Sequence, residues 1–138
     1  MISTKGRYAL RVMIDLAEHR EQDRVPLKDI AERQEISKKY LEIIVRDLVA
    51  GGLVRGTSGK GGGYRLCRDP ETCTVYEILR CAEGTLASVA CLADPDFDCP
   101  RRAFCKTLPM WKEYDGMVRD FFSGKKLSDL MGEPVPQD

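Results

Sequence analysis

Apolar residues recur three and four positions apart over residues 4–20, and Val12 and Leu16 belong to this pattern. Such spacing places the apolar side chains on one face of a helix. Ser3 and Thr4 are residue types that cap a helix N-terminus. The pattern therefore predicts a first helix from about residue 4 to about residue 20.

Two shorter helices are predicted next. Pro26 suits the first turn of a helix over residues 27–34. Ser37 is a good N-cap for a third, amphipathic helix that ends near Ala50. The glycine pair at 51–52 would end this helix, because glycine readily takes the left-handed conformation of a helix terminus.

A glycine-rich stretch, residues 59–63, separates two short runs that begin at Leu53 and Tyr64. Two short strands around a flexible tip are typical of a β-hairpin. Helix, short turn, helix and glycine-tipped hairpin, in that order, form the winged variant of the helix-turn-helix. The predicted fold class is therefore mainly α with a small β-hairpin wing.

The second half of the chain predicts two more helices and a loop. One helix begins near Thr74 and ends at Gly84, and residues 85–108 then look irregular. A long helix over residues 110–122 follows from an apolar stripe that indicates core or interface packing rather than a cofactor site. The stripe contains Trp111, Tyr114, Met117, Val118 and Phe121.

A winged helix-turn-helix indicates DNA binding, with helix 27–34 bracing and the helix after Ser37 entering the major groove. The start of that helix reaches base edges, where Lys donates to guanine or phosphate and Glu accepts from cytosine. At the wing tip, Lys60 would contact phosphate, and the glycines would let the backbone approach DNA closely. The candidate DNA-binding residues are Ser37, Lys38, Lys39, Tyr40, Glu42, Lys60, Gly61 and Gly62.

The charge distribution agrees with a DNA-binding front half. The whole chain has a formal net charge of zero, but residues 1–66 carry +4 and residues 67–138 carry −4. No apolar run is long enough for a membrane span, and no secretory signal opens the chain, so we expect a cytoplasmic protein without a membrane partner. With one histidine and no nucleophile set, paired carboxylates or nucleotide loop, we expect no enzyme.

Three of the six cysteines lie in the irregular segment, as Cys91-x7-Cys99-x5-Cys105. Thiolates are soft ligands that suit zinc or iron–sulfur clusters, and stable disulfides are not expected in a reducing cytosol. The spacing matches neither zinc ribbons nor ferredoxins, and three thiols make an incomplete ligand set. Structural roles are expected for the other cysteines, Cys67, Cys73 and Cys81.

Several stretches together resemble the Rrf-two family of bacterial transcription regulators, with most likeness to its IscR branch of iron–sulfur cluster regulators. The resemblance covers about residues 1–131 and implies a homodimer on a double-stranded DNA operator, with the long C-terminal helix crossing between subunits. It also implies that Glu42 discriminates between operator classes. The stretches are Ser3–Ala9, Ile30–Gln34, Tyr40–Glu42, Gly51–Val54 and Gly61–Tyr64.

The resemblance further implies that Cys91, Cys99 and Cys105 bind an iron–sulfur cluster. A two-iron two-sulfur cluster is favoured over a four-iron four-sulfur cluster, and iron–sulfur assembly proteins would be further partners. Leu108 stands where the branch has a ligand histidine, and Arg7 where nitric-oxide sensors have an aspartate. The fourth ligand stays open between an exogenous thiol, water, another cysteine, a partner carboxylate, or one of Asp94, Asp96 and Asp98.

These expectations divide the chain into four segments and leave two functions open. Residues 1–83 would form the DNA-binding domain, 84–108 the cluster-binding loop, 109–131 the dimerisation helix and C-terminal segment, and 132–138 a flexible tail. The first function is a transcription regulator that senses a cluster through the three cysteines. The alternative is a metal-free repressor of the same family, controlled by thiol oxidation or by a metabolic enzyme partner.

Overall fold

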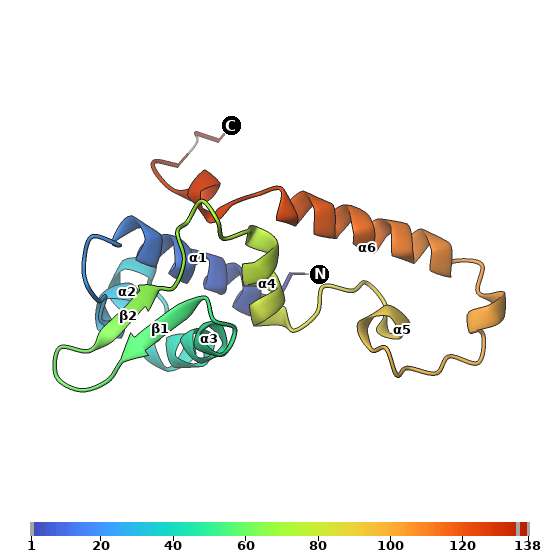
Figure 1. The fold of residues 1–138 in the computed structure, drawn as a ribbon, viewed down its shortest axis with the longest axis horizontal. Coiled ribbons are helices and arrows are strands. Elements are labelled where there is room, and N and C mark those ends of the chain that lie inside the picture. The colour runs from blue at the N-terminus through green and yellow to red at the C-terminus, as the bar shows by residue number, and fades with distance from the viewer. Residues whose placement is uncertain (1, 135, 138) are drawn as a thin grey trace.

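The computed structural model describes residues 2–134, 136 and 137 (Figure 1). The described residues are mainly helical, with a two-stranded antiparallel sheet between the third and fourth helices, and the predicted fold class is confirmed. In chain order the elements are α1 (Thr4–Glu18), α2 (Leu27–Gln34), α3 (Lys38–Ala50), β1 (Val54–Thr57), β2 (Gly63–Leu66), α4 (Val75–Glu83), α5 (Ala90–Ala93), η1 (Arg102–Phe104), α6 (Leu108–Ser123) and η2 (Leu127–Leu130).

Local sequence explains where most of these helices begin. The side chains of Ser3, Ser37 and Thr74 accept hydrogen bonds from backbone N–H groups three residues on, as N-caps do. The ends of α3 and α4 are followed by Gly51 and Gly84, as predicted. The first helix is two residues shorter than predicted, and α6 is slightly longer at both ends.

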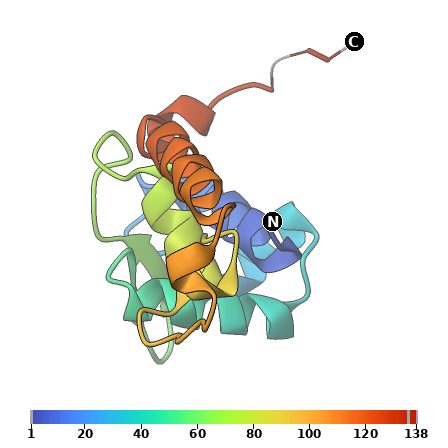
Figure 2. The same ribbon diagram turned by 90° about the vertical axis from the view of Figure 1, so that its right-hand side faces the viewer.

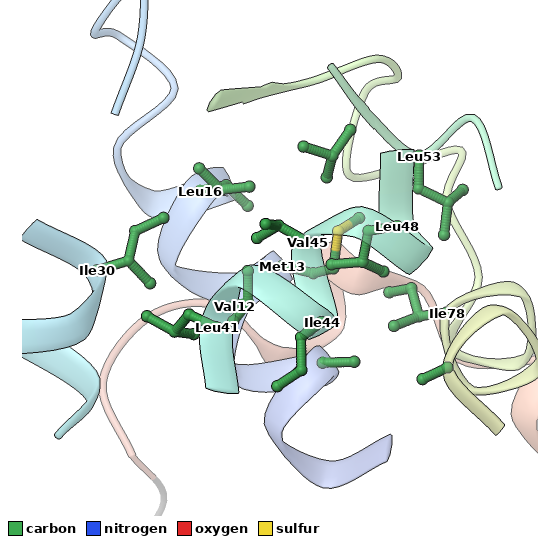
Figure 3. Packing of buried hydrophobic residues seen from close by; sticks show 14 of the residues in the cluster. Val12, Met13, Leu16, Ile30, Leu41, Ile44, Val45, Leu48, Leu53 and Ile78 are labelled. Carbon is green, nitrogen blue, oxygen red and sulfur yellow. The ribbon is translucent and has the colours of Figure 1, made fainter. Parts of the chain in front are cut away.

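One apolar core joins the first four helices and the start of the hairpin (Figure 3). The buried faces of α1 and α3 supply most of it, and α4 packs across both helices. Burying an aliphatic side chain of this size contributes about 1.5–3 kcal/mol, so this core is the main source of stability. Its labelled members in Figure 3 are Val12, Met13, Leu16, Ile30, Leu41, Ile44, Val45, Leu48, Leu53 and Ile78.

The hairpin is attached to the helical core beside α2. β1 and β2 pair antiparallel, with Val54 opposite Leu66 and Thr57 opposite Gly63. A bridge then joins Tyr64 to Val25, the residue just before the N-cap of α2, through two backbone hydrogen bonds of 2.9 Å. These bonds fix the position of the wing relative to α2 and α3.

The segment between α4 and α6 leaves the helical core to one side. Figure 1 shows α5 and α6 extending away from α1, α2 and the hairpin, with α4 between the two parts, and Figure 2 shows α6 nearly end-on. The segment that the pattern predicted as irregular contains two single turns, α5 and η1. Beyond α6 the chain returns to the core, where Leu127 is fully buried and donates its N–H to the Cys73 carbonyl. Within the described residues, no helix is both long and apolar enough to span a bilayer.

Candidate functional site

The first turn of α3 presents polar side chains to solvent. Lys38, Lys39 and Glu42 are exposed, and the hydroxyl of Ser37 accepts a hydrogen bond of 3.2 Å from the Tyr40 N–H. The structure therefore uses Ser37 as the cap that starts the helix. The three charged side chains project from the end of α3 that would meet base edges and phosphates.

Tyr40, which was also predicted to bind DNA, has a packing role in the structure. Its ring is half-buried and lies edge-to-face against Tyr8 of α1, with ring centroids 5.7 Å apart. The Arg11 guanidinium lies over the other ring, 4.9 Å from the Tyr8 centroid. This contact holds the start of α3 on α1, so any contribution of Tyr40 to DNA binding includes orienting the helix.

The glycines at the wing tip are required by the backbone path. Gly61 has a φ of 78°, a conformation that other residues rarely adopt. A Cβ at Gly62 would lie 2.2 Å from the Thr57 carbonyl oxygen, and one at Gly63 would lie 2.7 Å from that of Val25. The exposed Lys60 is carried by this tight turn.

The start of α3 and the wing face one shared hollow of about 410 Å³. Lys38 and Glu42 line it from α3, Gly59 and Gly62 line it from the wing, and Lys28 lines it from α2. The two parts of the predicted interface are thus neighbours in space. Sequence reasoning missed Lys28, although a cation in the first turn of the bracing helix could have suggested it.

An ion pair between the buried Asp15 and the partly exposed Arg33 fixes α2, the helix before the reading helix, to α1. Asp15 is 1% exposed and accepts bonds from Arg33 Nε at 2.9 Å and Nη2 at 2.8 Å. The Gln34 amide donates a third bond to Asp15, and the hydrogen bond with Asp15 raises the pKa of Arg33. Sequence reasoning missed this bridge, although a carboxylate beside Leu16 within the apolar stripe was its signal.

The three loop cysteines are half-buried and come from different parts of the segment. Cys91 lies in α5, Cys99 precedes η1, and Cys105 directly follows η1. No three His, Cys, Asp or Glu side chains within the described part of the chain are gathered closely enough to hold a single metal ion. A hydrogen bond with the Thr107 hydroxyl lowers the pKa of the Cys105 thiol.

The donor chemistry of this segment fits an iron–sulfur cluster in kind but is one protein ligand short. Three thiolates are the ligand type that such clusters take. Leu108 is buried at the first position of α6 and offers no donor atom. The three aspartates proposed as fourth ligands are exposed, and Asp94 already accepts a bond of 2.9 Å from the Asp96 N–H.

The remaining cysteines and the histidine lie outside this segment. Cys73 is buried, and Cys81 is half-buried with its thiol donating to the Asp47 carbonyl at 3.0 Å. Burial raises the pKa of both thiols, which agrees with the structural roles expected for them.

Cys67 is exposed directly after β2, so its side chain does not contribute to the core. His19 is the C-cap residue that follows α1, and its Nδ1 lies 2.8 Å from the Asp15 carbonyl oxygen.

Comparison with known proteins agrees with this geometry. The Rrf2 (Rrf-two) family model, described as an iron-dependent transcriptional regulator, matches residues 2–133. The IscR transcriptional regulator of Vibrio campbellii is 35% identical over 130 residues, which cover 94% of this chain and 76% of IscR. CymR, the global cysteine regulator of B. subtilis, superposes with a TM-score of 0.73 at 33% identity over 94% of this chain and 95% of CymR. IscR of T. potens has a TM-score of 0.73 at 35% identity over 94% of this chain and 85% of its own.

A winged helix-turn-helix whose reading helix and wing share one polar surface defines a DNA-binding transcription regulator. The chain belongs to the Rrf-two family of these regulators and is similar to IscR over most of its length. Its relatives are regulators rather than enzymes.

Proposed function

We propose that the chain binds a double-stranded DNA operator as a homodimer, through the start of α3 and the wing. The observation that carries this proposal is the shared hollow that places Lys38 and Glu42 beside the wing backbone. A lysine at this position neutralises phosphate or donates to guanine, and a glutamate selects a cytosine amino group. A regulator of this kind acts on the bacterial chromosome, and we therefore place the protein in the cytoplasm.

The α6 helix supports the homodimer. One of its faces is exposed and apolar over about three turns, which is costly for a monomer in water. A hollow of about 530 Å³ lies along the neighbouring face and is lined by Trp111, Val118 and Phe122. A second copy of α6 would cover both surfaces. The exposed apolar side chains of the helix are Met110, Tyr114, Met117 and Phe121.

Replacing Lys38 and Lys39 together with alanine tests the DNA-binding face. If both contact phosphate, the slope of log affinity against log salt becomes shallower by about 1.8 for each subunit, because each neutralised phosphate contributes about 0.9. The measurement is fluorescence anisotropy with an operator duplex at several salt concentrations. Lys112→Ala, which removes an exposed lysine from α6, is the matched control and should leave the slope unchanged. Equal slopes for the double variant and the wild type would exclude these two contacts.

We propose further that Cys91, Cys99 and Cys105 bind an iron–sulfur cluster, with two irons favoured. The support is a set of three half-buried thiols on the segment between α4 and α6, which leaves the helical core. When bound, the cluster would supply a redox-sensitive and loss-sensitive signal. The fourth ligand stays open.

The chain itself links that segment to the DNA-binding part. Glu83 is the last residue of α4, and its Oε1 accepts hydrogen bonds from the N–H and hydroxyl of Ser3, at 2.9 Å and 2.7 Å. Lys5 of α1 forms an ion pair with Asp47 of the reading helix. A change in the order of the cysteine segment would therefore reach α3 through α4 and α1.

Cysteine replacement tests the cluster site. Protein purified without oxygen should contain iron and sulfide and absorb visible light, and replacing Cys91, Cys99 and Cys105 together with alanine should remove the iron and the absorption. Cys67→Ala, which removes an exposed thiol outside the segment, should keep both. Iron and sulfide contents equal to wild type in the triple variant would rule out these ligands.

The second candidate function is a metal-free repressor controlled by thiol oxidation or by an enzyme partner. The similarity to CymR, a cysteine regulator, favours it. Protein purified without oxygen would then contain no iron. Its operator affinity would change on treatment with a disulfide oxidant and return with a reductant.

A further inference from the structure

A second hollow lies beside Cys91 and carries an unusual concentration of positive charge. It measures about 450 Å³ and lies between α4, the α5 segment and α6. Arg80, Arg102 and Arg119 line it, whereas Asp115 is its single carboxylate. These arginines belong to residues 67–138, the half of the chain that carries a net charge of −4. Their convergence therefore runs against the local charge balance.

The arginines are largely free to bind a ligand. Within the described residues, Arg80 and Arg102 make no ion pair and no side-chain hydrogen bond. Arg119 reaches only the exposed Asp120, at 3.7 Å. The Asp115 carboxylate already accepts the Ser88 N–H at 3.0 Å. Unpaired guanidinium groups around a hollow are suited to carboxylates, which they bind through two parallel hydrogen bonds.

The size of the hollow and its other lining residues further restrict the class of ligand that fits it. Its volume is in the range of small-molecule sites, and Leu92 adds an apolar wall. Cys91 lines the same hollow. A ligand bound to the arginines would thus reach Cys91, the first of the three proposed cluster ligands.

We propose that this hollow binds a small thiol with at least two carboxylates, which pair with the arginines and place the sulfur beside Cys91. This inference rests on the proposed cluster site, for which the thiol would supply the fourth sulfur ligand. If the cluster is present, the ligand would bind as a thiolate, its proton passing to solvent, and would supply the fourth sulfur donor beside Cys91. Ligation changes no oxidation state and requires no further reactant.

The first arm of the test uses metal-free protein. It therefore tests whether the arginines of the hollow bind a dicarboxylate, whether or not a cluster forms. Titration calorimetry with glutathione and with S-methylglutathione should detect similar binding, because the arginines recognise the carboxylates. Replacing Arg80 and Arg102 together with glutamine should lower the affinity for each compound at least tenfold. Arg101→Gln removes an exposed neighbour that does not line the hollow and should bind as wild type does. The anion site is overturned if wild type binds neither compound or if the double variant binds both equally well.

The second arm uses protein reconstituted with iron and sulfide without oxygen. Glutathione should change the visible circular dichroism and the electron paramagnetic resonance of the reduced protein, whereas S-methylglutathione should not. The double arginine variant should need at least tenfold more glutathione for the same change. Equal spectra with and without glutathione would overturn the ligand role of the thiol. If no iron binds at all, the proposed cluster site is wrong. The first arm would still show whether the hollow binds the carboxylates.

Discussion

Replacing Arg33 with alanine is expected to lower the free energy of unfolding by about 3 kcal/mol, because it leaves a buried carboxylate without its cation. Asp15 is 1% exposed and would retain only the Gln34 amide among its side-chain donors from α2. The loss would also loosen α2 from α1, so operator affinity should fall together with stability. Urea unfolding followed by circular dichroism measures the first effect, and fluorescence anisotropy measures the second.

An exposed arginine provides the matched control for Arg33. Arg24 pairs with Asp23, whose side chain is 72% exposed, and Arg24→Ala should change stability by no more than about 0.5 kcal/mol because water screens the pair. Adding Asp15→Asn to Arg33→Ala should recover part of the loss, since the buried charge is then gone. A cost for Arg33→Ala as small as that for Arg24→Ala would show that the ion pair does not brace α2.

Replacing Gly63 with alanine is expected to displace the wing from α2. The added Cβ would lie 2.7 Å and 2.8 Å from backbone atoms of Val25, which cannot rotate away as a side chain could. Breaking the bridge between Val25 and Tyr64 should cost about 2 kcal/mol of stability, the usual scale for an overpacked site. Operator affinity should fall at least about tenfold, which corresponds to about 1.4 kcal/mol of lost binding energy.

Gly116 provides the control for the glycine substitution. It lies inside α6, where a Cβ would meet only the end of the Arg119 side chain at 3.7 Å. Gly116→Ala should therefore keep or raise stability, because alanine is favoured over glycine within a helix by about 1 kcal/mol. If Gly63→Ala melts and binds operator as wild type does, the wing does not depend on this close approach.

The helices and the hairpin could be predicted from the sequence because their signals are local. Ser3, Ser37 and Thr74 cap the helices that they were predicted to cap or begin, and the tight wing requires Gly61, Gly62 and Gly63. The turns inside residues 84–108 were not predicted, since α5 and η1 are each about one turn long. One turn contains too few residues for a hydrophobic period to be recognised.

The candidate sites were predictable in part. The positions of Lys38 and Glu42 at a helix start followed from the cap at Ser37, so their exposure could be expected. The packing of Tyr40 on Tyr8 could not, because an aromatic residue in a first turn is compatible with either a buried or an exposed ring. The spacing of the cysteines along the chain likewise does not determine their separation in space.

The sequence by itself determined the order of the elements, the caps, the glycine-tipped wing and the family, because each depends on neighbours within a few residues or on a contiguous motif. Only the tertiary structure decided how Asp15 joins Arg33, how the wing meets Val25 and α3, and how three arginines gather beside Cys91. These contacts join residues that are distant in sequence. They depend on how helices pack against one another, and the local pattern of polar and apolar residues does not determine that packing in advance.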